Sequence, residues 1–305
     1  MDQQYNFDGR VAVVTGAGRG IGRAHALLLG KLGACVVVND LGGTMEGVGA
    51  DAGPAHDVAS EITAAGGRAI ANGNDVSTVD GGQAIIDAAV NEFGRIDIIV
   101  NNAGIVRWAG LPECDADNMN ANHAVHVMGS FNTTRAAWPH MVEQGYGRIV
   151  MTTSTGMFGL LDNLAYATAK AAVVGMARSL TVNGAPHGIK INLIAPAAYT
   201  RMAGGMSDTG TMPAEVPQTM TPEFVAPMVA FLASEACTVS GEIYAAGANH
   251  FTRIFTAETP GYVHTSEGVP TIDDVGRNWS AINDETGYYV PRDLLDWSAH
   301  FMAHR

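Results

Sequence analysis

The chain has 305 residues, of which 47% are hydrophobic, and its mean hydropathy of +0.09 allows a large buried core without membrane character. Its 17 basic and 30 acidic residues give a formal charge of −13 without a basic cluster, which argues against a nucleic-acid partner. No apolar run reaches the ~20 residues that span a bilayer, and no signal-peptide pattern opens the chain, so we expect a cytoplasmic protein without a membrane partner.

Short β-branched runs alternate with longer Ala- and Leu-rich stretches over residues 10–246, a pattern typical of a parallel sheet covered by helices. Most of the runs are continuously apolar, as strands buried on both faces should be. We predict seven strands, at residues 11–15, 35–39, 68–71, 96–101, 148–153, 190–194 and 242–246. We predict six helices between them, at residues 21–32, 55–65, 79–93, 115–144, 163–183 and 222–234. The predicted fold class is α/β, a doubly wound, parallel seven-stranded sheet with helices on both faces.

Two later stretches depart from this alternation. Residues 203–220 are rich in Gly and Met and lack periodicity, which is typical of a loop that covers a substrate. Beyond Gly247 the composition changes, and a further helix is predicted near residues 291–300. We therefore expect a domain at residues 1–250 and a C-terminal extension at 251–305. The extension could cover the active site, contact another subunit or pack on the core, and Trp279 and Trp297 favour packing over disorder.

A glycine motif directly follows the first predicted strand and opens a helix; its residues are Gly16, Gly18, Arg19, Gly20, Ile21 and Gly22. Glycines allow a tight turn and a close approach of the backbone to a pyrophosphate, whose charge meets the positive end of the helix. An ordinary glycine-rich turn could look the same. Asp40, however, ends the second strand, where a carboxylate can bind the adenosine ribose and repel a 2′-phosphate. We therefore predict NAD as the cofactor, with Arg19 as the one residue that favours NADP.

Tyr166 and Lys170 lie four residues apart in a predicted helix and therefore share one face. Two unit charges about 5 Å apart at an effective dielectric near 20 interact by roughly 3 kcal/mol, or about two pKa units. The ammonium would thus lower the pKa of the phenol toward neutrality, where it can act as a general acid and base. Such a pair is ordinarily an amphipathic contact, and only the other motifs indicate catalysis.

Those motifs are the glycine turn, Asn101-Asn102-Ala103-Gly104 after the fourth strand, Ser154 after the fifth, and Tyr166 with Lys170. Together, over residues 10–247, they resemble the short-chain dehydrogenase/reductase family. The resemblance implies a Rossmann-like fold with its site at the carboxyl ends of the strands, hydride transfer between NAD(H) and a secondary alcohol or ketone, and a homodimer or homotetramer.

The resemblance also implies residue roles. Tyr166 would exchange a proton with the substrate oxygen, Lys170 would lower the pKa of the phenol and bind the nicotinamide ribose, and Ser154 would hold the substrate oxygen. The remaining cofactor contacts would be Asp75 and Val76 at the adenine, Asn102, Ala103 and Gly104 along the middle of the cofactor, and Pro196, Tyr199 and Thr200 at the nicotinamide carboxamide.

The chain departs from the family pattern at two points. The family usually places its serine thirteen residues before the tyrosine, where this chain has Thr153, and Ser154 stands at twelve. We choose Ser154 because counting forward from the strand puts it in register, and Thr153 is the fallback. The helical asparagine of the family's proton relay is replaced by His126, which could be structural or could hold a water.

Within the family, the chain is most similar to the (3R)-hydroxyacyl-CoA dehydrogenase domain of peroxisomal multifunctional enzymes and to related bacterial hydroxysteroid and hydroxyacyl-CoA dehydrogenases. The resemblance is carried by Asn39-Asp40-Leu41-Gly42-Gly43, by His126 before Gly129-Ser130-Phe131, and by Tyr146-Gly147-Arg148. It implies an acyl-CoA or a steroid-like substrate, although few basic groups are available for CoA phosphates.

Two alternatives remain. One is an NADP-dependent carbonyl or 3-ketoacyl reductase, which Asp40 disfavours, and the other is a nicotinamide-binding regulator whose altered motifs mean a decayed site. Three cysteines, far apart and odd in number, predict neither a disulfide framework nor a metal site.

Overall fold

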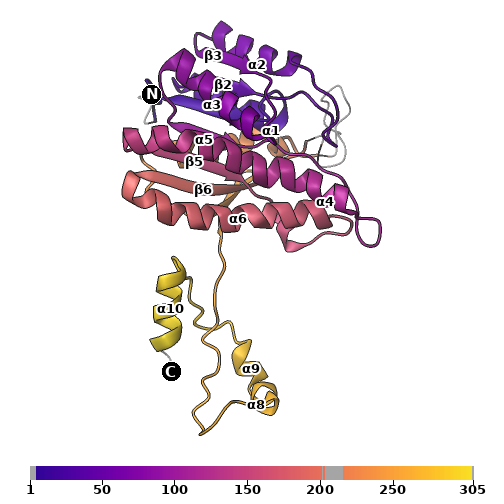
Figure 1. Cartoon of the computed structure of the whole chain (residues 1–305), viewed down its shortest axis with the longest axis vertical. Coiled ribbons are helices and arrows are strands. Elements are labelled where there is room, and N and C mark those ends of the chain that lie inside the picture. The colour runs from indigo at the N-terminus through magenta and orange to yellow at the C-terminus, as the bar shows by residue number, and fades with distance from the viewer. Residues whose placement is uncertain (1–4, 201, 203–215, 304–305) are drawn as a thin grey trace. The chain divides into compact units, whose positions relative to one another are not determined.

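The computed structural model describes residues 5–200, 202 and 216–303, and its contacts divide the chain into two compact units, Met1–Arg253 and Ile254–Arg305. The second unit holds the short helices α8 (Ile272–Arg277), α9 (Trp279–Ile282) and α10 (Leu294–Ala303), of which the sequence predicted only the last (Figure 1). Inside this unit the ring of Tyr289 stacks on His300 with the centroids 3.8 Å apart. Most of the stretch 203–220, expected to cover a substrate, lies outside the described residues.

The first unit is built on one sheet with the strand order β3-β2-β1-β4-β5-β6-β7-β8, and every neighbouring pair from β3 to β7 is parallel. Its first seven strands are β1 (Val11–Thr15), β2 (Cys35–Asn39), β3 (Arg68–Asn72), β4 (Ile98–Asn101), β5 (Gly147–Thr152), β6 (Ile189–Pro196) and β7 (Ile243–Gly247). Each lies within two residues of the predicted bounds. The α/β, Rossmann-like fold class is therefore confirmed, and the strand order reverses between β1 and β4.

An eighth strand, β8 (His250–Ile254), was not predicted. A two-residue turn joins it to β7, with Ala248 at φ 49° and Asn249 at φ 60°. A turn this short connects antiparallel strands, and positive φ at both central residues suits a hairpin. Neither the exposed, weakly alternating strand nor an alanine in the left-handed region signals a hairpin in the sequence, which explains why the predicted count was seven.

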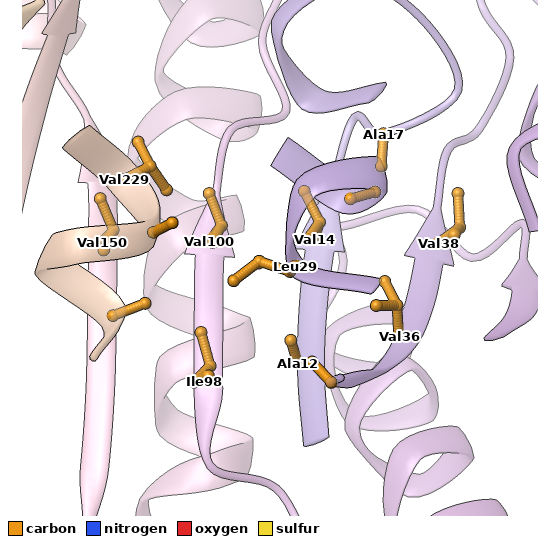
Figure 2. Close-up of a cluster of buried hydrophobic side chains, with 14 of the residues drawn as sticks. Ala12, Val14, Ala17, Leu29, Val36, Val38, Ile98, Val100, Val150 and Val229 are labelled. Atoms are coloured by element: carbon orange, nitrogen blue, oxygen red, sulfur yellow. The ribbon is translucent and has the colours of Figure 1, made fainter. Parts of the chain in front are cut away.

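Helices cover both faces of the sheet. They are α1 (Gly20–Lys31), α2 (Gly53–Ala64), α3 (Val79–Phe93), α4 (Ala116–Asn122), α5 (Gly129–Gln144), α6 (Leu164–Gly184) and α7 (Ala226–Ala233). On one face, Leu29 of α1 and Val229 of α7 pack in the same buried cluster as Val14, Val100 and Val150 of the sheet (Figure 2). On the other face α3, α5 and α6 lie together (Figure 1). Full burial of each such aliphatic side chain stabilises the fold by about 1.5–3 kcal/mol, so the sheet is a rigid support for the loops at its edges.

The predicted helix at residues 115–144 is interrupted. α4 ends at Asn122, a π-helical segment η1 runs from His123 to Met128, and α5 begins at Gly129. A π-helical turn widens a helix locally and is frequent at functional sites. This one carries His126. In the part of the chain that the structure describes, no helix is both long enough and apolar enough to cross a membrane.

Candidate active site

The ends of four strands bring the predicted motifs together. β1 ends at Thr15, β4 at Asn101, β5 at Thr152 and β6 at Pro196, and parallel pairing puts all four ends at the same edge of the sheet. The edge between β1 and β4 is the point where the strand order reverses, and loops there leave in opposite directions. Ligands of open α/β sheets bind at such a point, so the candidate site lies here.

The glycine turn after β1 has no room for a side chain at Gly16 or Gly22. A Cβ atom on Gly22 would lie 2.1 Å from the carbonyl oxygen of Gly16, and one on Gly16 would lie 2.8 Å from the Cα of Ala103. Gly20, in contrast, faces open space, with only the Thr200 methyl 3.8 Å away among the described atoms. Because α1 begins at Gly20 and its N-cap makes no side-chain hydrogen bond, its first amides, Ile21 included, can bind a pyrophosphate.

The end of β4 is fixed to this turn by reciprocal hydrogen bonds. The Oγ1 of Thr15 accepts from the amides of Asn102 and Ala103 at 3.1 and 3.0 Å. The Nδ2 of Asn102 donates in return to the carbonyl oxygens of Thr15 and Gly16, both at 3.0 Å. Asn102 therefore holds the glycine turn in shape, which is a more specific role than lying along the cofactor.

Asp40 stands across the glycine turn at the end of β2. Its Oδ2 accepts from the amide of Gly18 at 2.7 Å, and its Oδ1 accepts from the amide of Gly42 at 2.7 Å. The carboxylate is thus oriented beside the turn, where an adenosine ribose would lie. Farther along the edge, Asp75 and Val76 follow β3, and the Nδ2 of Asn132 in α5 donates to the carbonyl of Val76 at 3.0 Å.

Ser154 and Tyr166 converge on one point. A Cβ atom on Gly156 would lie 3.2 Å from the Oγ of Ser154 and 3.3 Å from the Cε1 of Tyr166, and a side-chain hydrogen bond from Ser154 acts on the phenol. The hydroxyl of Thr153 is buried instead and donates to the carbonyl of Lys170 at 2.7 Å. Of the two candidate hydroxyls, only that of Ser154 faces the tyrosine.

Lys170 is buried beneath the tyrosine. Its Nζ donates to the carbonyl of Thr152 at 2.8 Å and lies 5.5 Å from the ring centroid of Tyr166. Burial lowers the pKa of Lys170 to about 7. The pKa of Tyr166 is raised above 10, because burial of the phenol outweighs the opposing hydrogen bond from Ser154. For the chain without cofactor, the prediction that the lysine charge lowers the pKa of Tyr166 is therefore wrong.

His126 contacts the same tyrosine from the π-helical segment. The two rings meet edge to face at 5.3 Å, and the Nε2 of His126 lies 2.8 Å from the carbonyl oxygen of Ile105. Burial, and then the charge of Lys170, lower the pKa of His126 well below 6.5, against the effect of the Ile105 hydrogen bond. The imidazole is therefore neutral, and its Nδ1 has no hydrogen-bond partner among the described residues. Gly104 lies beside it, since a Cβ there would meet the Cε1 of His126 at 2.5 Å.

The segment after β6 completes the edge. Ala197 donates to the carbonyl of Ala246 at 2.8 Å, and Tyr199 donates to the carbonyl of Met220 at 2.7 Å, so the backbone from Pro196 to Thr200 stays at the carboxyl edge. Two contributors were missed from the sequence. Ile105 and Thr152 act through backbone carbonyls, which any residue possesses, so no residue type indicates them.

Five large apolar residues on the two loops beside Ser154 are exposed to solvent over 51% to 85% of their surface. They are Trp108, Leu111, Phe158, Leu160 and Leu161. The loops are joined by a bridge between Ala109 and Asn163, at the start of the helix that carries Tyr166. We call this group the apolar rim. Side chains of this kind exposed together mark a surface that binds another apolar group.

Comparisons with known proteins agree with this geometry. Residues 10–209 match the family model described as short chain dehydrogenase. A short-chain type dehydrogenase/reductase of Mycobacterium tuberculosis is 42% identical over 279 residues, which cover 91% of this chain and 95% of that protein. The peroxisomal multifunctional enzyme type 2 of Mus musculus is 38% identical over 97% of this chain, which spans 40% of the mouse enzyme.

Two solved structures are also similar. The full-length peroxisomal multifunctional enzyme type 2 of Drosophila melanogaster superposes with a TM-score of 0.80 at 32% identity, over 98% of this chain and 49% of that one. A 7α-hydroxysteroid dehydrogenase complexed with NADH and 7-oxo glycochenodeoxycholic acid superposes with a TM-score of 0.70 at 28% identity, over 80% of this chain and 94% of that one. The chain thus spans less than half of the mouse and fly multifunctional enzymes.

Proposed function

Because this chain belongs to the short-chain dehydrogenase/reductase family, we propose that it transfers a hydride between NAD(H) and an apolar secondary alcohol or ketone, of which a 3-hydroxyacyl-CoA or a hydroxysteroid is the leading candidate. The observation that carries the proposal is the convergence of Ser154 on the phenol of Tyr166, with Lys170 buried behind the ring. These three groups lie at the edge of the sheet where the glycine turn can hold a dinucleotide.

Each residue has a role that follows from its contacts. Bound nicotinamide supplies or accepts the hydride. The Ser154 hydroxyl hydrogen-bonds to the substrate oxygen, and the Tyr166 phenol gives a proton to that oxygen or takes one from it. Lys170, held by the Thr152 carbonyl, lies behind the phenol, and in its protonated form it would favour ionisation of the phenol against the effect of burial. His126 is neutral and fixes one side of the tyrosine ring.

The surroundings of the ribose support NAD as the cofactor. Asp40 presents a carboxylate beside the glycine turn. Arg19, the residue that favours NADP, lines a hollow of about 450 Å³ together with three carboxylates, Asp51, Asp57 and Glu61. A second arginine in this hollow, Arg23, is already paired with Glu61. A 2′-phosphate would therefore meet more negative than positive charge here.

The cofactor preference can be measured by steady-state reduction of NAD⁺ and of NADP⁺ with a panel of hydroxyacyl-CoAs, hydroxysteroids and simple secondary alcohols. We expect kcat/KM to favour NAD⁺ by about 100-fold, the size of a charge-assisted hydrogen bond of ~2–3 kcal/mol. Asp40→Ala should reduce this preference to about 10-fold or less, and the exposed Asp87→Ala on α3 should not change it. Preference for NADP⁺ in the unaltered chain would instead favour the carbonyl reductase alternative, to which Arg19 points.

The apolar rim predicts the kind of substrate. Replacing Phe158 and Leu161 together by Ser should raise KM for long-chain or steroid alcohols by about 30-fold, because each side chain would lose roughly 1 kcal/mol of apolar contact. KM for a short secondary alcohol should stay unchanged. Val182→Ser, which removes another exposed apolar side chain, at the other end of α6, is the matched control. An equal rise for short and long alcohols would show that the rim does not hold the substrate's apolar part.

Two further expectations rest on the sequence and the family resemblance. A homodimer or homotetramer and a cytoplasmic location therefore remain predictions. Several relatives are named as peroxisomal enzymes, and that location is a property of those proteins.

A further inference from the structure

The loop between β2 and α2, residues 41–52, begins immediately after Asp40 and is closed on itself. The amide of Asp51 donates to the carbonyl of Leu41 at 2.9 Å, and Thr44 donates to the carbonyl of Val48 at 2.8 Å. The Oδ1 of Asp40 binds the amide of Gly42 at the base of the loop. A ribose that binds to Asp40 would therefore contact the same carboxylate that holds the base of this loop.

The tip of the loop docks on residues 105–107, which follow β4. The amide of Val106 donates to the carbonyl of Met45 at 2.9 Å, and the Nε of Arg107 donates to the carbonyl of Glu46 at 2.8 Å. Gly47, at φ +82°, lies against Ile105, since a Cβ there would approach its Cγ2 to 3.0 Å. Between these two segments, within the residues that the structure describes, the Arg107 bond is the one hydrogen bond made by a side chain.

Residues 105–107 touch the catalytic groups on their other side. The amide and the carbonyl of Ile105 both face the Nε2 of His126, at 3.3 and 2.8 Å. His126 in turn packs edge to face against Tyr166. Hydrogen bonds and packing thus run without a gap from Asp40, through the loop and Ile105, to the tyrosine. Energetic coupling between two sites can be carried by such a contiguous set of contacts.

We propose that Arg107 is a positioning residue, which clamps residues 41–52 onto residues 105–107 and so links the ribose site at Asp40 to the placement of His126 and Tyr166. This inference rests on the proposed function. A guanidinium suits the task because its Nε–H donates to a backbone carbonyl while the long aliphatic stem spans the junction. Arg107 also accepts, through its carbonyl, a 3.2 Å hydrogen bond from Asn118 of α4, which fixes the segment from the opposite side.

The test compares Arg107→Met, which keeps most of the stem but removes the donor, with Arg107→Lys, which keeps a donor. Arg95→Met is the matched control, because it breaks the bidentate pair with Asp97 just before β4, at the opposite edge of the sheet. For each protein, three quantities are measured on the full chain: the Kd of NADH by fluorescence, the exchange of the Val106 amide with deuterium with and without NADH, and kcat and KM for the best alcohol.

Arg107→Met should lower kcat about 10-fold and raise the Kd of NADH by a similar factor, the effect of one charge-assisted hydrogen bond. KM for the alcohol should change less than about twofold, and NADH should no longer slow exchange at Val106. Arg107→Lys should recover most of both effects. Arg95→Met should lower the Tm and leave kcat, Kd and NADH-dependent exchange as they are.

Unaltered kcat and NADH-dependent exchange in Arg107→Met would overturn the clamp. So would an Arg107→Lys protein no better than Arg107→Met, because a donor would then be irrelevant. If the unaltered chain neither binds NADH nor oxidises any alcohol, the proposed function itself fails, and the clamp fails with it. The clamp alone fails when the unaltered chain is active and Arg107 proves dispensable.

Discussion

Tyr166→Phe is expected to lower kcat by about 1,000-fold while NADH binds as before. The phenol oxygen is the one atom lost, and general acid and base catalysis by a positioned group contributes roughly 10²–10⁴-fold. The ring itself is held by packing against His126 at 5.3 Å and faces the Nζ of Lys170, so a phenylalanine fills the same space. Turnover is measured with the best alcohol and NAD⁺, and binding by the fluorescence of NADH.

Tyr146→Phe is the matched control. This second partly buried tyrosine lies just before β5, at the opposite edge of the sheet, between the guanidinium groups of Arg10 and Arg148, whose carbons stand 3.8 and 4.3 Å from its ring centroid. Loss of its hydroxyl leaves the ring between those groups, and kcat should stay within about twofold. Equal turnover of Tyr166→Phe and the unaltered chain would remove the phenol from the chemistry and favour the regulator that binds nicotinamide without reacting.

The sheet was predictable because burial on both faces leaves a local signature. Residues 11–15 and 35–39 are continuous apolar runs between glycine-rich turns, and the structure gives β1 and β2 those same bounds. Both strands lie in the middle of the sheet, so every side chain is buried and every position favours the same residue types. β8, at the edge of the sheet, has mostly exposed side chains and no such constraint, and it was missed.

The site was predictable where a side chain carries the chemistry. Tyr166, Ser154, Asp40 and the glycine turn were chosen by residue type and order, and the fold brings them to one edge. The π-helical turn at His126 was not predictable, because its helix hydrogen bonds depend on contacts with residues far along the chain, Ile105 among them. The raised pKa of Tyr166 was also missed, since spacing along a helix reports the nearby charge but not the loss of water around the phenol.

Lys170→Met is expected to abolish most of the activity and, at the same time, to stabilise the cofactor-free chain at neutral pH. The folded chain lowers the pKa of Lys170 from 10.5 to about 7, because the ammonium is buried. At or below pH 7 the folded protein therefore carries a charge that costs roughly 5 kcal/mol, from ~1.4 kcal/mol for each pKa unit. Removing the amine also removes its hydrogen bond to Thr152, worth about 1–3 kcal/mol, so the net gain should be about 3 kcal/mol.

The dependence on pH distinguishes removal of a buried charge from a simple gain in apolar packing by the methionine. Between pH 7 and 10.5 the unfolded chain holds a proton that the folded chain has lost, so the unaltered protein gains stability as the pH rises through this window. Lys170→Met lacks that gain, so its advantage should fall to zero near about pH 9 and turn into a disadvantage by about pH 10, where only the lost hydrogen bond remains. Urea unfolding at several pH values measures the difference, and the exposed Lys31→Met on α1 serves as the control. A constant advantage at every pH would mean that burying the charge of Lys170 does not destabilise the folded chain.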